Sequence, residues 1–71
     1  MDAIDIKYAI EKAGSTQTAI AKTCGVSQVQ VFRVINNLTV SDHVRREIAR
    51  VIGRDVKEIW PEYYLKKVLG G

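Results

Sequence analysis

The sequence is poor in the residues that would stabilise a secreted or metal-bound domain. Its 71 residues include one cysteine, one histidine and one proline. A single cysteine excludes an intramolecular disulfide, and one Cys with one His cannot complete a four-ligand zinc site. No apolar run approaches the roughly 18 residues that a membrane-spanning helix needs. We therefore expect residues 1–71 to form one domain that acts without a cofactor, a metal or a membrane.

Arrangements of residues that support catalysis are also missing. The chain has no paired carboxylates, no Cys with a companion His and no Gly-rich phosphate loop, and a domain of this size has little room for a substrate pocket. We therefore expect neither an enzyme nor a small-molecule substrate. Asp2 and Asp5 interrupt the start, where a signal peptide would carry a long apolar run. The expected location is the reducing cytoplasm of a bacterial or phage-infected cell.

Acidic residues are absent from one long stretch. The chain has 8 acidic and 11 basic residues, yet no Asp or Glu occurs between Lys12 and Ser41. Lys22 and Arg33 lie inside this stretch, and four arginines follow it: Arg45, Arg46, Arg50 and Arg54. Duplex DNA is a dense polyanion, so an acid-free surface suits docking, and Lys and Arg release counterions there. For any one of these Lys or Arg side chains, the alternative to DNA contact is a solvated position on the surface.

The hydrophobic pattern is helical, with no sustained alternation of the strand type. We predict an all-α, compact bundle of five short helices: residues 2–13, residues 16–24, residues 27–37, one that Ser41 caps and Gly53 ends, and one that Asp55 and Glu58 begin with a capping box. Gly14 is expected to end the first helix, and Pro61 to interrupt the fifth. Leu38 is expected to pack inward and Trp60 to join the core.

The second and third predicted helices fit a helix-turn-helix. Ala21 is small enough for two helices to cross closely, and four residues later Gly25 gives the backbone freedom for a tight turn. Apolar residues stand where both helices must face one core: Ile20, Cys24, Val26, Val31 and Val34. Thr16 is a candidate N-cap for the second helix, and Ser27 with Gln30 a candidate capping box for the third.

Three further segments surround this motif: Gly14-Ser15-Thr16, Ile48-Ala49-Arg50-Val51-Ile52-Gly53 and Ile59-Trp60-Pro61-Glu62-Tyr63-Tyr64. With them, most of residues 5–64 resembles the lambda-repressor-like, Cro-type regulators. Among these, the chain is most similar to the Ner-type regulators of transposable phages and their bacterial relatives. The resemblance implies operator binding and transcriptional control, commonly repression of a phage promoter.

In such a fold the third helix enters the major groove of double-stranded DNA, while the second crosses the backbone. We expect Gln28 to pair with adenine, Val29 to contact a thymine methyl, and Gln17 to bind a phosphate and orient Gln28. For Arg33, a guanine contact and a phosphate contact both stay open. The full predicted DNA-binding set is Thr16, Gln17, Ser27, Gln28, Val29, Gln30, Phe32, Arg33, Asn36 and Asn37.

Several members of this set have a structural role as the alternative. For Ser27 and Gln30 that role is helix capping, and for Phe32 it is half-buried packing beside the core. Asn36 and Asn37 stand near the helix end, where capping competes with a phosphate contact.

The second half of the chain allows more than one interpretation. For residues 62–71 two interpretations stay open: a tail folded over the core, or a docking and self-association surface. The second would give a homodimer, at least on DNA. The alternative function is an antitoxin or phage accessory factor whose main partner is a protein. For Arg45 and Arg46, contact with flanking phosphates, solvation and pairing with Glu47 all stay open.

Overall fold

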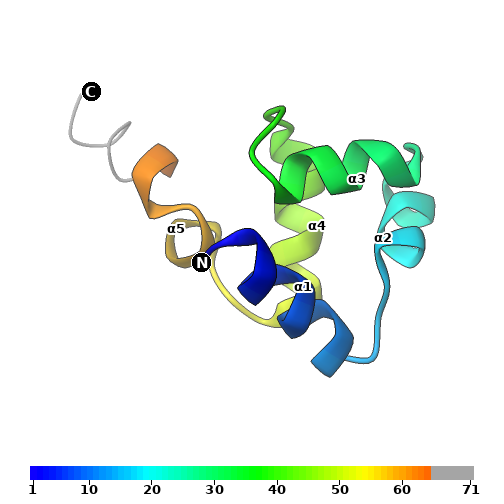
Figure 1. Cartoon of the computed structure of the whole chain (residues 1–71), viewed down its shortest axis with the longest axis horizontal. Coiled ribbons are helices and arrows are strands. Elements are labelled where there is room, and N and C mark those ends of the chain that lie inside the picture. Colours follow the sequence, from blue (N-terminus) through cyan, green and yellow to red (C-terminus); the bar gives the residue numbers. More distant parts are fainter. Residues whose placement is uncertain (65–71) are drawn as a thin grey trace.

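The chain folds into short helices joined by tight connections (Figure 1). The structure, a computed structural model, describes residues 1–64. Over that range it contains five α-helices: α1 Ala3–Lys12, α2 Gln17–Cys24, α3 Gln28–Ile35, α4 Asp42–Ile52 and α5 Val56–Ile59. Residues 61–64 form a further helical turn, and residues 1–64 include no β-strand. The predicted all-α bundle is confirmed, with each predicted boundary within two residues.

Each helix begins where a side-chain oxygen accepts from a free backbone N–H. Thr16 Oγ1 accepts from the Ala19 N–H at 3.0 Å, and Ser27 Oγ accepts from the Gln30 N–H at 3.2 Å. The other caps are Asp2 for α1, Ser41 for α4 and Asp55 for α5. Within residues 1–64 the Gln30 side chain makes no return bond to Ser27. Only half of that predicted capping box therefore forms.

The turn between α2 and α3 depends on Gly25. Its φ of 70° lies in the left-handed region, where a side chain would strain the backbone. The Gly25 and Val26 N–H groups donate to the last carbonyls of α2, which closes the helix end. This turn brings α3 back against α2, as the helix-turn-helix prediction requires (Figure 1).

Helix α3 ends at Ile35, two residues before its predicted end. The Asn36 Nδ2 donates to the Phe32 carbonyl at 2.9 Å, and Asn37 adopts a positive φ of 59°. These contacts turn the chain away from the helix axis. Leu38 is consequently 68% exposed, so the prediction that it packs inward is wrong.

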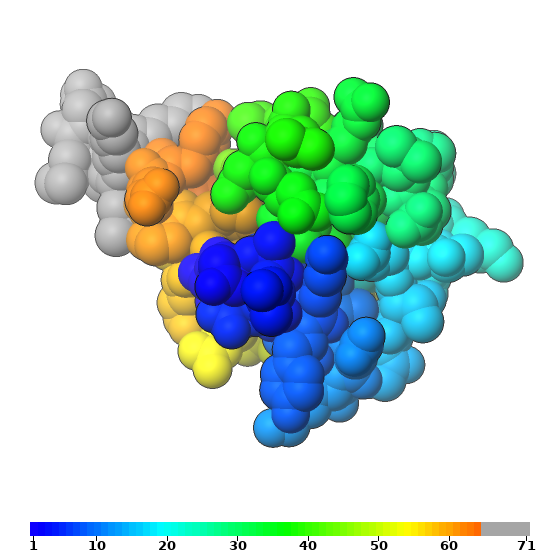
Figure 2. Space-filling view, viewed as in Figure 1, coloured from blue at the N-terminus to red at the C-terminus, as the bar shows by residue number. Residues whose placement is uncertain are grey.

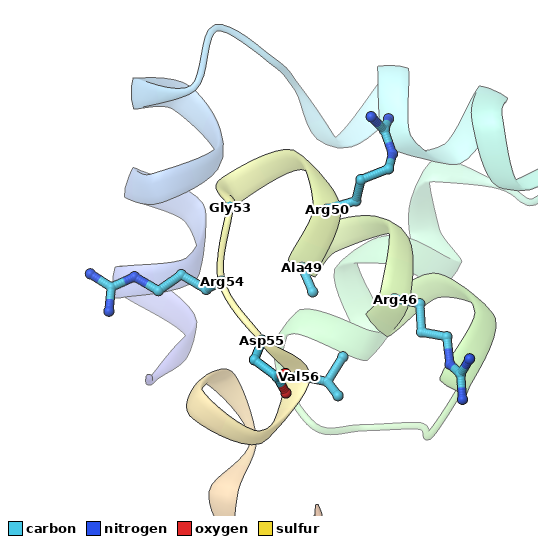
Figure 3. Close-up of a pocket in the computed structure, with 7 residues that line it drawn as sticks. All are labelled: Arg46, Ala49, Arg50, Gly53, Arg54, Asp55 and Val56. Carbon is cyan, nitrogen blue, oxygen red and sulfur yellow. The ribbon is translucent and has the colours of Figure 1, made fainter.

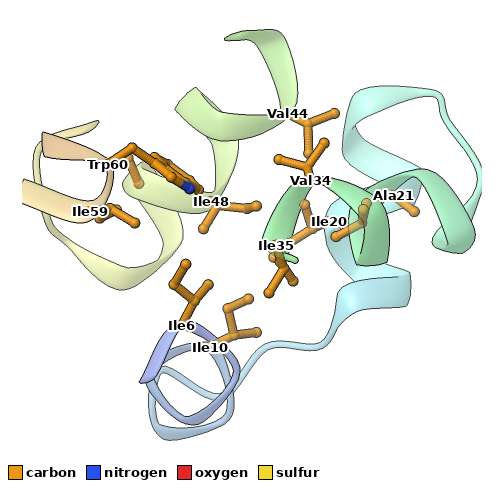
Figure 4. Packing of buried hydrophobic residues seen from close by; sticks show 12 residues of the cluster. Ile6, Ile10, Ile20, Ala21, Val34, Ile35, Val44, Ile48, Ile59 and Trp60 are labelled. Carbon is orange, nitrogen blue, oxygen red and sulfur yellow. The ribbon is translucent and has the colours of Figure 1, made fainter. Parts of the chain in front are cut away.

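All five helices contribute to one apolar core (Figure 4). Its buried members are Ile6, Ile10, Ile20, Ala21, Val31, Val34, Ile35, Val44, Ile48, Ala49, Ile59 and Trp60. The inward positions of the helix-turn-helix are confirmed, with Cys24 and Val26 half-buried against the same core. Since α3 supplies three of these side chains, the core fixes which face of α3 points outward.

Arg45 is the main departure from the sequence prediction. Only 3% of it is exposed, whereas we expected a surface residue with a phosphate, water or Glu47 as its partner. Its guanidinium lies 4.9 Å from the ring centroids of both Trp60 and Tyr63. Pro61, placed at the first position of a new helical turn, lets residues 61–64 fold back over α4.

Glu47 pairs with a different arginine from the two we considered. The Arg50 Nε donates to the Glu47 Oε1 at 2.9 Å, and this hydrogen bond lowers the pKa of Glu47. Arg46 instead pairs with Asp42 at 2.7 Å, one helical turn away. The predicted pairing of Arg45 or Arg46 with Glu47 is therefore wrong.

Candidate nucleic-acid interface

One face of α3 carries side chains that the core does not use. Gln28, Val29, Phe32 and Arg33 are exposed, with 55% of Val29 and 40% of Phe32 accessible. Val31, Val34 and Ile35 occupy the opposite face and are fully buried. The predicted outward orientation of α3 is thus confirmed. The core therefore anchors α3 by one face. The exposed side chains Gln28, Val29, Phe32 and Arg33 on the other face, called the ridge below, stay available to a partner.

Gln17 and Gln28 join the beginnings of α2 and α3. The Gln28 Nε2 donates to the Gln17 Oε1 at 3.0 Å, across the turn of the motif. This bond leaves the Gln28 Oε1 and its second amide hydrogen available, which are the two groups that adenine N6 and N7 require. The Gln17 Nε2 keeps both of its hydrogens for an acceptor such as a phosphate oxygen. The predicted orienting contact between the two side chains is confirmed.

Arg33 lies one turn further along α3 and has no ionic partner. It makes no salt bridge with any residue of the part of the chain that the structure describes. An exposed guanidinium without a carboxylate keeps its five donors for bidentate contact with a guanine edge or a phosphate.

Unlike Arg33, three arginines of α4 and of the loop after it form ion pairs with carboxylates. Arg46, Arg50 and Arg54 line a shallow pocket of about 380 Å³ on another face, but their side chains point in different directions (Figure 3). Each is paired with a carboxylate: Arg46 with Asp42, Arg50 with Glu47 and Arg54 with Glu58. These pairs reduce the positive potential of that face, so α3 is the better polyanion surface.

Lys7 is a neighbour of this ridge that the sequence prediction missed. Its Nζ lies 5.4 Å from the centroid of the Phe32 ring, in cation–π contact. The first residues of α1 meet α3 and the loop after it on the face shown in Figure 2. Phe32 is exposed and is not among the side chains that pack against the core, so the alternative of half-buried packing is not borne out, and its ring positions a cation beside α3. No local pattern in the sequence signals a contact between elements 25 residues apart.

The remaining predicted residues fall into two groups. Thr16 and Ser27 are exposed caps at the same end of the motif as Gln17 and Gln28, and Gln30 is half-buried beside them. Asn36 and Asn37 follow the last residue of α3, about 12 Å along the helix axis from its start.

Asn36 and Asn37 are engaged within the fold. Asn36 caps the Phe32 carbonyl, and the Asn37 Oδ1 accepts from the Arg45 Nη2 at 3.5 Å. Their capping role is confirmed, and the structure does not bring them together with Gln28.

Cys24 offers no reactive group to this surface. Burial raises the pKa of its thiol, and the negative charge of Glu47 raises that pKa further. The thiol is therefore neutral at pH 7 and behaves as a small apolar side chain. Residues 1–64 contain no group of three or more His, Cys, Asp or Glu side chains that could hold a metal ion.

Replacing Gln17 tests the contact between the two glutamines. Gln17→Ala is expected to weaken specific DNA binding about 5- to 10-fold, since it removes one phosphate donor and the acceptor that orients Gln28. The slope of log Kd against log salt should stay unchanged, because no charge is lost. Thr18→Ala, an exposed neighbour on α2, is the control and should bind normally. Equal affinities for Gln17→Ala and the parent would show that the pair has no role in DNA binding.

Three further findings concern the chain as a whole. No helix within residues 1–64 combines the length and apolar character that crossing a membrane requires. A domain-family model described as winged helix-turn-helix DNA-binding matches residues 1–69 of the chain. No curated protein and no solved structure matches the chain.

Proposed function

The chain belongs to the winged helix-turn-helix DNA-binding family, and we propose that it is a transcriptional repressor that reads its operator with α3. The single observation that carries this proposal is the hydrogen-bonded pair Gln17–Gln28 at the start of an exposed, acid-free α3. We base the assignment on that site, since the family description specifies a wing and residues 1–64 include no β-strand.

Base recognition follows from the chemistry of the exposed ridge. Gln28 Oε1 accepts from adenine N6 and the second amide hydrogen of Gln28 donates to adenine N7, while the first amide hydrogen stays on Gln17. Val29 presents an aliphatic group to a thymine methyl beside it. Arg33, one turn later, reads guanine or binds the phosphate at the groove edge. This arrangement makes the first turn of α3 the main source of specificity.

Phosphate contacts hold the ridge in register with the groove. Gln17 and the N-terminus of α2 meet one phosphate, with Thr16 and Ser27 capping the two helices beside it. Lys7 beside Phe32, the exposed Lys22 of α2 and Arg33 of α3 would each neutralise one phosphate. Three neutralised phosphates correspond to a slope of about −2.7 in log affinity against log salt.

Repression of a phage-type promoter would follow from occupancy of its operator. One copy of the domain covers one major-groove face. Two copies would bind two half-sites about 34–36 Å apart, so a palindromic operator is expected if the protein pairs on DNA. The expected self-association segment, residues 62–71, lies outside the described residues from residue 65 onward. The antitoxin or accessory-factor alternative depends on that segment, and no contact in residues 1–64 favours it.

Selection of bound duplexes from a random library tests this proposal. The enriched operator, labelled for anisotropy, should bind at least about 1,000-fold more tightly than a scrambled duplex of equal composition. Its affinity should fall steeply between roughly 50 and 200 mM salt. Equal affinity for the operator and the scrambled duplex would overturn sequence-specific recognition. A reporter whose promoter overlaps the operator then separates repression from activation.

A further inference from the structure

The ridge of α3 contains two apolar side chains that do not contribute to the core. Val29 is 55% exposed and Phe32 is 40% exposed, and neither is among the partly buried side chains packed against the core. The two residues are three positions apart on one helix, so their side chains are neighbours on its surface. They therefore form one apolar patch. Gln28 lies four positions from Phe32, and Arg33 four positions from Val29, so a polar or charged side chain borders each member.

The charges around the patch argue against an apolar protein partner. Arg33 borders it, and the Lys7 Nζ lies 5.4 Å from the centroid of the Phe32 ring. Glu11, one turn along α1 from Lys7, forms no ion pair with it in the part of the chain that the structure describes. An apolar protein surface would bury these cations without a counter-charge, which is costly. Duplex DNA supplies phosphates for both cations, so the partner of the patch is expected within a groove of DNA.

The major groove offers one kind of apolar group to such a patch. The edges of guanine, cytosine and adenine present hydrogen-bond donors and acceptors there, whereas thymine adds the methyl group on its C5 atom. A methyl group on C5 of cytosine occupies the same position in the groove. Aliphatic and aromatic side chains on a recognition helix contact this methyl group. The patch therefore matches a C5-methylated pyrimidine.

We propose that Val29 and Phe32 together form a site for the C5 methyl groups of pyrimidines, so that the domain distinguishes thymine from uracil and 5-methylcytosine from cytosine. This methyl site rests on the proposed function, in which Val29 alone contacts a thymine. It adds Phe32 to the residues that determine specificity. It also makes the methyl group, rather than the base that carries it, the feature that is recognised, so methylation of a cytosine at this place strengthens binding.

The spacing along α3 places the methyl groups close to the adenine that Gln28 reads. Phe32 follows Gln28 by four residues, or about 6 Å along the helix axis. Successive bases on one strand are about 3.4 Å apart, so Phe32 reaches about one to two base pairs beyond that adenine when α3 lies along the groove. Val29 immediately follows Gln28 and reaches the adjacent base pair. Thymine or 5-methylcytosine is therefore expected within two base pairs of the adenine.

Deoxyuridine substitution tests the site, because uracil differs from thymine only in lacking the C5 methyl group. Each thymine of the selected operator is replaced in turn, and competition anisotropy with the full chain gives the Kd. We expect replacement to weaken binding about 4-fold at one or two thymines, as for loss of one buried methyl group. An unchanged Kd at every thymine, on an operator that the chain still prefers to a scrambled duplex, would overturn the methyl site.

Variants assign the effect to the two side chains. Phe32→Ala and Val29→Ala should each bring the ratio of the deoxyuridine Kd to the thymine Kd down to about 1 at a thymine where the parent shows about 4. Both side chains are exposed, so neither truncation removes a core residue. Tyr8→Ala is the matched control, since Tyr8 is another exposed aromatic residue in contact with a lysine, and it should keep the parent ratios. Parent ratios at every thymine in Phe32→Ala would overturn the proposal.

A cytosine arm separates the methyl group from the rest of thymine. The thymine whose effect depends on Phe32 is replaced by cytosine or by 5-methylcytosine, each paired with guanine, and the two bases carry the same hydrogen-bonding groups. We expect 5-methylcytosine to bind about 4-fold more tightly than cytosine in the parent, and equally tightly in Phe32→Ala. Equal affinities in the parent would overturn recognition of the methyl group independently of its base.

Failure of the proposed function would give a different result. Equal Kd values for the operator and the scrambled duplex in the parent would overturn sequence-specific binding, and the methyl site with it. A clear preference for the operator with no deoxyuridine effect would overturn the methyl site alone.

Discussion

A chain that carries both Gln28→Ala and Arg33→Ala is expected to lose about 2–6 kcal/mol of specific DNA-binding free energy, since each truncation should cost about 1–3 kcal/mol. Gln28 loses its bidentate contact with adenine, and Arg33 loses a contact with guanine or phosphate. The two side chains share no hydrogen bond in the described structure, so their effects should add. Competition anisotropy on the selected operator measures both the single and the double variants.

The single variants also separate the two roles left open for Arg33. If Arg33 binds a phosphate, Arg33→Ala lowers affinity for all duplexes and reduces the salt slope by about 0.9. If it reads guanine, the loss is concentrated at one operator base pair. Arg54→Gln is the matched control, because it removes one positive charge from the loop after α4, at the opposite side of the molecule from α3 (Figure 1). An equal loss in Arg54→Gln and Arg33→Ala would contradict a specific role for α3.

Ile35→Ala is expected to lower the free energy of unfolding by about 2–5 kcal/mol. The side chain of Ile35 is 0% exposed and packs where α3 meets the core (Figure 4), so its truncation leaves a cavity. A chain of this length should have only about 4–10 kcal/mol of stability in total. The variant should therefore be close to unfolding at physiological temperature, which urea denaturation followed by circular dichroism can measure.

Ile4→Ala is the control for this experiment. Ile4 is 76% exposed on α1, so the same kind of truncation removes little buried surface. Its effect on stability should stay within about 0.5 kcal/mol. A loss below about 1 kcal/mol for Ile35→Ala, or equal losses for both variants, would contradict the description of α3 as anchored by the core.

The sequence predicts the local structure well because its signals act over a few residues. Thr16, Ser27 and Ser41 each accept from an N–H three positions later, and Gly25 ends α2 through its own backbone freedom. These interactions need no knowledge of the rest of the chain. The position of Gln28 beside Gln17 is equally local, because the turn length fixes how α3 meets α2.

Contacts between distant elements could not be predicted in this way. Arg45 is buried because Trp60 and Tyr63 fold back over α4, and that depends on the direction of the chain after Pro61. Lys7 reaches Phe32 only because α1 packs beside α3. Nothing in the spacing of these residues indicates such contacts, since each is set by how whole helices pack.

Backbone amide chemical shifts of the labelled protein, recorded with and without the selected operator duplex, test the central claim most directly. We expect the largest changes at Gln17 and from Ser27 to Arg33, where α2 and α3 begin. Residues Arg46 to Arg54, on the ion-paired face of α4, should change little. The largest changes at Arg46 to Arg54, with Gln28 unaffected, would show that DNA binds another face and that α3 is not the recognition helix.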